Sequence, residues 1–295
     1  MTDSKTLSGT ELLTWRRQQL ARGGAAGDLD WLIDLAGGVP WASLQRLLLD
    51  PSRTVAMEQS LEVLSEQWGR HLQENVPLQH LVGLCPWRDL LLESSPAALI
   101  PRQETELLVD LALSQFTASP PSRWADLGTG SGAIAVSLAR AWPTAQGHGV
   151  DLSPEALRLA ERNIQRCALH HNCSLHLGSW WTPLKTWWGS LDLVISNPPY
   201  IPSPVVHGLE AVVRDHEPHL ALSGGEDGLD AIRAVVDGAS TGLSPGGWLL
   251  LEHHHDQSDP VTTLMRDTGL VEVSAVADLE GTLRFALARK PSSTS

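Results

Sequence analysis

The chain carries an apolar run followed by a polar, proline-rich tail at residues 191–200, LDLVISNPPY. A short apolar run with a glycine before it and prolines after it predicts a buried strand. Asn197 then lies just beyond the carboxyl end of that strand, with its carboxamide accessible. In open α/β sheets, this edge is where ligands bind. We therefore expect residues 197–200 to form part of a binding site.

The tail NPPY has the chemistry to hold a planar amino group. Pro198 and Pro199 restrict the backbone so that the carbonyls before and between them remain free to accept hydrogen bonds. The side-chain oxygen of Asn197 and the carbonyl of Pro198 then offer two acceptors, which match the two hydrogens of an NH₂ group. Tyr200 adds a flat surface for stacking. An ordinary proline turn after a strand would have the same letters.

Strand and helix patterns alternate from Arg123 onward. We expect a strand at 124–127, a tight glycine turn at 128–132 and a helix at 133–142. Repeated units of this size predict an α/β fold with a Rossmann-like, doubly wound parallel sheet. The other expected elements are strands at 145–150, 174–178 and 246–252, a helix at 153–169 capped by Ser153, and an antiparallel edge from 271–276 and 282–288.

The first part of the chain, up to about Leu81, shows helical periodicity and no strand alternation. Asp28 is expected to cap the second helix, a third helix is expected at 41–49, and a longer one at 53–71. Such a domain is either a platform that docks a macromolecule or a structural cap. The expected organisation is a helical domain at 1–82, a hairpin linker at 83–101 and an α/β domain at 102–291.

Composition excludes several classes of protein. The net charge of -13 argues against a surface that binds nucleic acid directly. No apolar run is long enough to cross a membrane, and the polar start is no signal peptide, so we expect a cytoplasmic protein without a membrane partner. The three cysteines, Cys85, Cys167 and Cys173, lack metal-binding spacing and are expected to be free thiols.

The glycine turn leaves two cofactors open. Gly128, Gly130 and Ala133 fit the loose dinucleotide fingerprint, and Asp151 lies where an acid that binds ribose is expected, so a nicotinamide enzyme is one alternative. Both features equally suit S-adenosylmethionine, which has a ribose but no phosphate. Asp126 favours a cationic methionine group over a pyrophosphate. The paired acceptors of the NPPY tail favour methyl transfer to nitrogen, so we favour S-adenosylmethionine.

Several further segments make the chain resemble a known family, the HemK-like protein-(glutamine-N5) methyltransferases that modify bacterial peptide chain release factors. The glycine loop alone is unspecific, but the ordered set is highly specific. The matching segments are 77–81 with Gly83, 99–106, 126–133, 197–201, Glu217 and Pro218 with Ala221 and Leu222, Gly224, Gly225 and 227–229, and 245–247.

The resemblance implies a class I methyltransferase domain at 102–291 that modifies the glutamine of the release factor's Gly-Gly-Gln loop, with the helical domain and the hairpin helping to hold the release factor. A ribosomal protein and nucleic-acid adenine N6 are the alternative substrates. The implied catalytic residues are Asn197, Pro198, Pro199 and Tyr200, which with Arg102 and Glu104 also bind substrate. The implied cofactor residues are Asp126, Gly128, Thr129, Gly130, Ser131, Gly132, Asp151, Trp180 and Asn197.

Three positions depart from the family pattern. Gln103 replaces a usual proline, which should loosen that loop slightly. Ser179 replaces an acid that often precedes the tryptophan, which weakens the assignment of Trp180. His253, His254 and His255 replace a glycine-containing turn after Glu252. Adjacent histidines in a strand cannot all point one way, so we expect a solvated strand end and no metal site.

Overall fold

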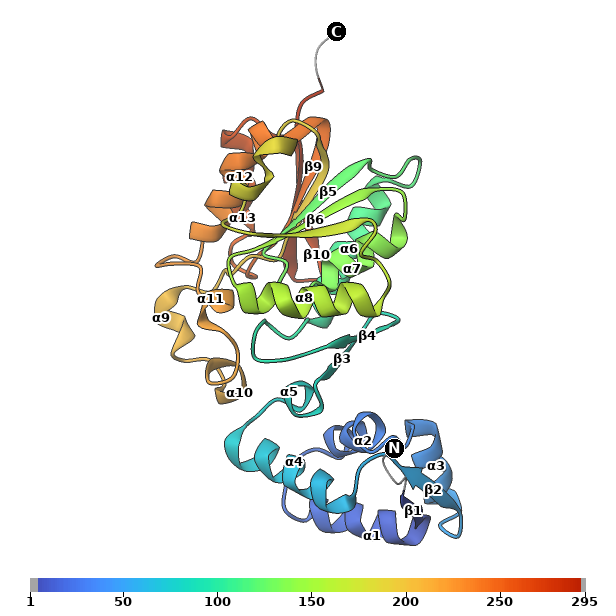
Figure 1. The fold of residues 1–295 in the computed structure, drawn as a ribbon. Helices are drawn as coiled ribbons and strands as arrows, with labels where there is room; N and C mark the ends of the chain where they lie inside the picture. The colour runs from blue at the N-terminus through green and yellow to red at the C-terminus, as the bar shows by residue number, and fades with distance from the viewer. Residues whose placement is uncertain (1–4, 293–295) are drawn as a thin grey trace. The chain divides into compact units, whose positions relative to one another are not determined.

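The computed structural model describes residues 5–292 and divides the chain into two compact units, Met1–Leu84 and Cys85–Ser295 (Figure 1). The division falls within the expected hairpin. Its strands are β3 (Leu84–Trp87) and β4 (Leu90–Glu93), which form a two-stranded sheet of their own.

Helices dominate the first unit, but it also contains a small sheet that the sequence analysis missed. Strand β1 (Lys5–Ser8) pairs antiparallel with β2 (Thr54–Met57), so the expected helix at 53–71 is wrong in its first part. Ser60 instead caps a later start, because its side chain accepts a hydrogen bond from the N–H of Val63. The helices of this unit are α1 (Gly9–Leu20), α2 (Ala26–Leu35), α3 (Trp41–Leu49), α4 (Leu61–Glu74) and α5 (Leu78–Val82).

The expected cap of the second helix is also wrong. Helix α2 begins after Ala25, which makes no side-chain capping bond, and Asp28 lies inside the first turn. A carboxylate there still favours the helix through the dipole of the peptide groups. Trp68 is fully buried in the core of this unit and donates its indole N–H to the carbonyl of Gln19, which ties α4 to α1.

The second unit contains the expected doubly wound sheet, in the order β10-β11-β9-β8-β5-β6-β7. All its neighbouring strands are parallel except those paired with β11, which lies antiparallel between β9 and β10. The fold class and the antiparallel edge are thus confirmed. The strands are β5 (Arg123–Leu127), β6 (Gln146–Asp151), β7 (Cys173–Leu177), β8 (Leu191–Ser196), β9 (Leu243–Glu252), β10 (Val271–Ala277) and β11 (Leu283–Arg289).

Helices cover both faces of this sheet (Figure 1). One face packs against α6 (Gln103–Gln115), α7 (Ala133–Ala141) and α8 (Pro154–Arg166), and the other packs against α12 (Asp230–Gly242) and α13 (Ser258–Asp267). Ser153 caps α8 as expected. The remaining helical segments are the 3-10 helix η1 (Thr182–Trp187) and the short helices α9 (Ser203–Val206), α10 (Ala211–Arg214) and α11 (His219–Leu222).

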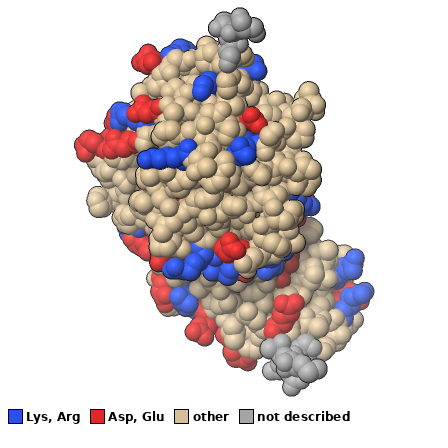
Figure 2. Space-filling model, turned by 45° about the horizontal axis from the view of Figure 1, so that its top comes forward, with Lys and Arg blue, Asp and Glu red and all other residues tan. Residues whose placement is uncertain are grey.

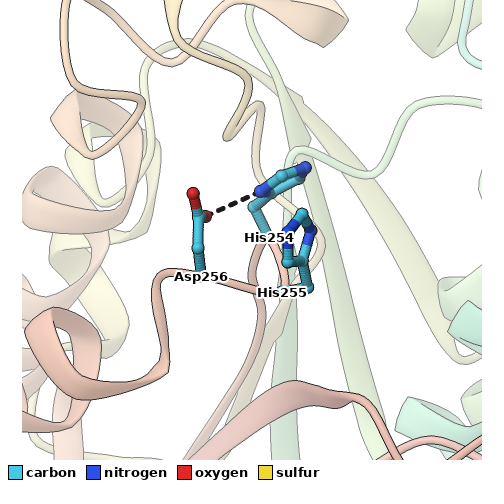
Figure 3. A group of neighbouring side chains, drawn as sticks. All are labelled: His254, His255 and Asp256. Atoms are coloured by element: carbon cyan, nitrogen blue, oxygen red, sulfur yellow. Dashed lines mark hydrogen bonds and ion pairs between the residues drawn. The ribbon is translucent and has the colours of Figure 1, made fainter.

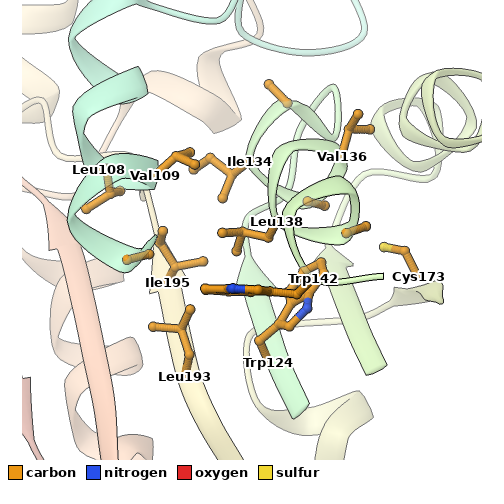
Figure 4. Packing of buried hydrophobic residues seen from close by; sticks show 14 of the residues in the cluster. Leu108, Val109, Trp124, Ile134, Val136, Leu138, Trp142, Cys173, Leu193 and Ile195 are labelled. Atoms are coloured by element: carbon orange, nitrogen blue, oxygen red, sulfur yellow. The ribbon is translucent and has the colours of Figure 1, made fainter. Parts of the chain in front are cut away.

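Alternate strand residues feed two separate cores, because successive side chains of a strand point to opposite faces. On β8, Leu193 and Ile195 pack with α6 and α7 around Trp124 and Trp142 (Figure 4), whereas Val194 packs on the opposite face. Both cores bury almost every apolar side chain of the central strands. The three cysteines are free, and Cys173 lies in the first of these cores.

The strand order places a topological switch point between β5 and β8. The chain continues from β5 to β6 on one side and returns to β8 on the other side, so a crevice opens at the carboxyl ends of β5 and β8. Ser196 joins the two strand ends by donating its hydroxyl to the carbonyl of Leu127 at 2.5 Å. The glycine turn after β5 and the NPPY tail after β8 therefore lie side by side.

No helix in the described part of the chain is long and apolar enough to cross a bilayer. On the face shown in Figure 2, most of the surface is uncharged, and basic and acidic side chains are interspersed.

Candidate active site

A cavity of about 400 Å³ lies in the second unit, at the carboxyl ends of β5, β6 and β8. Its walls are mainly apolar, with a few polar groups among them, as is usual for a small-molecule site. The expected site residues that line it are Arg102, Gly128, Thr129, Gly130, Ser131, Asp151, Trp180, Asn197 and Pro199. The expected residues outside its lining are Glu104, Asp126, Gly132, Pro198 and Tyr200.

The glycine turn lies against the cavity with its backbone exposed to a ligand. Gly128 and Gly130 have φ angles of 76° and 56°, which favour glycine. The N–H groups of Gly128 and Thr129 donate to the carbonyl of Val150 at 2.8 and 2.9 Å, which fixes the turn on β6. The ring of Trp180 lies 3.4 Å from the point where a Cβ of Gly128 would be. The turn and this indole form one continuous wall.

Asp151 joins the turn to the start of α8. Its Oδ2 accepts from the N–H of Gly130 at 2.8 Å, and its Oδ1 accepts from the N–H of Ser153 at 2.9 Å. Burial raises the pKa of this carboxyl, and the two backbone N–H groups oppose that rise. Each carboxylate oxygen can accept a further hydrogen bond, so Asp151 has the capacity to bind a diol in the cavity.

Asp126 has a different position from the one implied by the resemblance. It is fully buried and accepts the hydroxyl hydrogen bond of Thr129 at 2.6 Å, while Thr129 itself lines the cavity. Burial raises the pKa of Asp126 to about 7. Asp126 therefore acts on the cavity through Thr129 and does not line it.

The NPPY tail is held in place by bonds from helix α6, from strand β9 and from two loop residues, Gln257 and Ser223. The Asn197 Nδ2 donates to the hydroxyl of Thr105 on α6 at 3.0 Å. The Tyr200 hydroxyl donates to the carboxylate of Glu252 on β9 at 3.1 Å, and the Tyr200 carbonyl accepts from Gln257 at 2.9 Å. Ile201 forms an isolated parallel bridge with the chain at Ser223, which joins the tail to the cavity wall after α11.

Two buried residues behind the tail were not identified from the sequence. Thr105 donates its hydroxyl to Glu252 at 2.7 Å, so both residues connect to Asn197 and to Tyr200. Thr105 belongs to a segment that carries the family resemblance, which is the only signal that could have drawn attention to it. Burial raises the pKa of Glu252 to about 7.

The residues present fit S-adenosylmethionine. A glycine turn with an exposed backbone, an aromatic wall and a carboxylate with spare acceptor capacity meet in one mainly apolar cavity. These groups suit a ribose and an adenine. The backbone of Trp180, which lines the cavity, has a φ angle of 46°, in the left-handed region that favours glycine.

Comparison with known proteins supports a methyltransferase that uses this cofactor. Residues 103–226 match the family described as methyltransferase small domain. The release factor glutamine methyltransferase of Prochlorococcus marinus is 55% identical over 99% of this chain and 100% of its own. The enzyme of the same name from Synechocystis is 38% identical over 96% and 97%.

The chain belongs to the release factor glutamine methyltransferases. Among solved structures, the catalytic domain of hMettl16 in complex with an RNA hairpin of MAT2A is 15% identical over 81% of this chain and 84% of its own, with a TM-score of 0.55. That likeness shows the methyltransferase fold alone.

In this glutamine methyltransferase, Arg102 and Glu104 lie in different settings. The Arg102 guanidinium contacts both carboxylate oxygens of the buried Glu217 at 2.8 Å, which ties the start of α6 to the wall before α11. Glu104 is exposed on the first turn of α6. Gln103 is the first residue of that helix, where proline is tolerated because the N–H has no partner inside the helix.

The histidines of this methyltransferase correct one expectation. They follow β9 rather than extend it, and His253 is fully buried, so they are not simply a solvated strand end. The cause is a turn in which the His253 ring bonds to the carbonyl of His254 at 2.8 Å. Among the described residues, His254, His255 and Asp256 (Figure 3) have potential metal-ligand atoms within 4.8 Å of one another. Asp256 already accepts a hydrogen bond from His254 at 2.7 Å.

Proposed function

We propose that the protein transfers a methyl group from S-adenosylmethionine to the side-chain amide nitrogen of the glutamine in the Gly-Gly-Gln loop of peptide chain release factors. One observation carries the chemistry: Asn197 lies in the cavity wall with its Nδ2 engaged by Thr105, which leaves Oδ1 available for a substrate N–H. The relatives named release factor glutamine methyltransferase support this choice of substrate. Because release factors act on ribosomes, the proposal places the enzyme in the cytoplasm.

The substrate amide needs help because its nitrogen lone pair is delocalised into the carbonyl. Asn197 Oδ1 and the Pro198 carbonyl would each accept one N–H, so the nitrogen is held in a single orientation. Among the described residues, no backbone N–H donates to the Pro198 carbonyl, which is therefore available. Orientation of this kind is worth several kcal/mol of the barrier, roughly 7–11 in favourable cases.

The cofactor residues would each have a separate part. S-adenosylmethionine, when bound, supplies an electrophilic methyl group on a sulfonium. Gly128 and Gly130 would allow it to approach the backbone, Asp151 would accept hydrogen bonds from its ribose, and Trp180 would pack against its adenine. Ser131 and Gly132 would complete the turn, while Asp126 would hold Thr129 in position.

The cavity walls would keep water away from the reacting groups. Charge disappears from the sulfonium during methyl transfer, so an apolar and desolvated setting favours the reaction. Ala98, Leu99, Ile134 and Leu220 contribute apolar side chains to these walls. Pro199 adds a rigid apolar surface beside the site of the amide.

Tyr200 would support the substrate without acting as a base. Burial raises the pKa of its phenol, so the hydroxyl stays protonated. It donates a hydrogen bond to the carboxylate of Glu252. Arg102 forms an ion pair with Glu217 and so would hold in place the part of the cavity wall that the substrate glutamine side chain contacts on entry. Glu104, which is exposed, would contact the release factor outside the cavity.

Residues 1–82 would serve as the substrate-docking domain, with the hairpin at 83–101 as linker. The support for this is an exposed apolar surface on α3, where Trp41 and Leu49 are 60% and 88% exposed. Exposed large apolar side chains that share a helix face are typical of a protein interaction site.

The test uses purified protein, S-adenosylmethionine with a labelled methyl group, and a purified release factor. We expect label on the release factor, and none on a variant whose loop glutamine is alanine. Asn197→Ala should reduce transfer by about 100-fold or more while the cofactor still binds. A ribosomal protein and an adenine-containing DNA duplex are tested in parallel. Label on either of these instead of the release factor would contradict the proposal, as would loss of cofactor binding in Asn197→Ala.

A further inference from the structure

A chain of hydrogen bonds runs behind the NPPY tail. The Asn197 Nδ2 donates to the Thr105 Oγ1 at 3.0 Å, and the Thr105 Oγ1 donates to the Glu252 Oε2 at 2.7 Å. The other oxygen of Glu252 accepts from the Tyr200 hydroxyl at 3.1 Å. Glu252 is only 2% exposed and Thr105 only 4%. The tail after β8, helix α6 and strand β9 therefore meet in one polar network, and Thr105 is also one of the residues that line the cavity.

The number of protons in this network fixes the direction of every bond. An ionised carboxylate can only accept hydrogen bonds, and a threonine hydroxyl has one proton to give. When the Thr105 hydroxyl uses that proton in a hydrogen bond to Glu252, the Thr105 oxygen can only accept a hydrogen bond from Asn197. The atom of Asn197 that faces Thr105 must then be the amide nitrogen, and Oδ1 is the atom left for a substrate N–H.

We propose that Glu252 is a positioning residue for methyl transfer: through the hydroxyl of Thr105, it sets which way the Asn197 carboxamide faces. This inference rests on the proposed function, in which Asn197 Oδ1 accepts from the substrate amide. Glu252 does not line the cavity, so its effect on the substrate passes through Thr105 and Asn197.

Protonation of Glu252 would reverse the network. A carboxylic acid can donate to Thr105, whose own proton is then free to point toward Asn197. Asn197 would pair with it through Oδ1 and present its NH₂ to the substrate NH₂, so two donors would meet. The ionised form is therefore the active one.

Because Glu252 is buried, its protonation is expected within the pH range of an ordinary assay. Burial raises the pKa of Glu252 to about 7, while the hydroxyls of Thr105 and Tyr200 and the positive charge of Arg284 oppose the rise. The activity should therefore fall as the pH decreases through about 7. The titratable and charged groups around Glu252 are Glu104 on α6, Tyr200 in the tail, Arg284 on β11, and His253 and His254 after β9.

The experiment measures kcat, KM and cofactor affinity of the full-length enzyme between pH 5.5 and 9, with a release factor as substrate. Glu252→Gln removes the charge but keeps the size of the side chain. We expect kcat to fall about 10- to 100-fold, the acid limb of the pH profile to disappear, and the Kd of S-adenosylmethionine in calorimetry to stay within about twofold. Thr105→Val should give the same result, and the double variant should be no worse than either single one.

Two further variants separate positioning from general damage. Thr105→Ser keeps the hydroxyl and should retain both the rate and the acid limb. Thr262→Val changes another buried threonine, whose hydroxyl bonds to Asp259 and Arg266 of the same helix α13, and should leave kcat and the pH profile as in the wild type. If Thr262→Val lowered kcat as much as Thr105→Val, the loss would reflect a perturbed core and the inference would be wrong.

The outcome also distinguishes this inference from the proposed function. If Glu252→Gln kept its kcat and its acid limb while Asn197→Ala was inactive, only the positioning role would be overturned. If cofactor affinity fell in parallel with kcat, Glu252 would be a structural residue instead. If Asn197→Ala remained fully active, the proposed function itself would fail.

Discussion

Asp151 holds the glycine turn by two backbone hydrogen bonds and would also bind the cofactor ribose. Asp151→Asn can accept only one of these bonds and loses the charge. Because a hydrogen bond to a charged group is worth about 1.5–3 kcal/mol, the Kd of S-adenosylmethionine should rise about 10- to 100-fold. Calorimetric titration measures this. An analogue that lacks the ribose hydroxyls should lose affinity for the wild type and little for the variant.

A matched control lies at the opposite end of the sheet. Asp192 on β8 also accepts from two backbone N–H groups, those of Ser122 and Arg123, but it is outside the cavity. Asp192→Asn should leave the Kd unchanged. An equal rise in both variants would mean that the loss is a general effect of weakening a strand end.

The raised pKa of Asp126 predicts how the free energy of unfolding depends on pH. The pKa of Asp126 in the folded protein is about 7, against about 4 in an unfolded chain. Between these values, the folded protein holds a proton that the unfolded chain has released, so raising the pH costs the wild type stability. Asp126→Asn has no such dependence. We therefore compare the free energies of unfolding of Asp126→Asn and the wild type, both measured in urea. The difference, variant minus wild type, should rise from pH 4 to about pH 7 and then level off. A pH-independent difference would show that Asp126 is ionised throughout.

At the level of elements, β8 could be predicted because it is a short apolar run, whereas β6, which contains few apolar residues, could be predicted only from its place between two helical patterns. The pairing order could not, since β11 enters between β9 and β10 through contacts that local periodicity does not encode. Strand β2 was missed because its partner β1 is about 50 residues away. In the site, the positions of the glycine turn and Asn197 follow from strand ends. The contact of Thr105 with Glu252 spans 147 residues, and no local pattern indicates it.

Helix α12 packs closely against the indole of Trp181. A Cβ at Gly238 would lie 2.2 Å from the Trp181 Nε1, which donates to the carbonyl of Val235 at 3.0 Å. Alanine normally stabilises a helix by about 1 kcal/mol relative to glycine, but overpacking costs about 1–3 kcal/mol. Gly238→Ala should therefore lower the free energy of unfolding, as measured in urea. Ser240→Ala, on the exposed side of the same helix, should be neutral or slightly stabilising. Equal stability of Gly238→Ala and the wild type would mean that Trp181 can move aside.

The two units of the molecule are expected to divide the work of recognition. Trp41 and Leu49 lie eight residues apart on α3, so they belong to one face of that helix, and both are exposed. If this face docks the release factor, replacing both residues with serine removes contact area that lies outside the methyltransferase unit. The KM for the release factor should then rise about tenfold, because a few large apolar side chains supply most of the energy of such an interface.

The same double variant should leave other properties of the enzyme unchanged. Its kcat, its Kd for S-adenosylmethionine and its KM for a short Gly-Gly-Gln peptide should stay as in the wild type, because the residues that line the cavity all belong to the second unit. Leu279→Ser is the matched control, since Leu279 is 95% exposed but lies in the turn between β10 and β11. A rise in KM only for the double variant, and only with the whole release factor, would support docking on α3. An unchanged KM would mean that the release factor is recognised entirely by the methyltransferase unit, and that the first unit has a structural role.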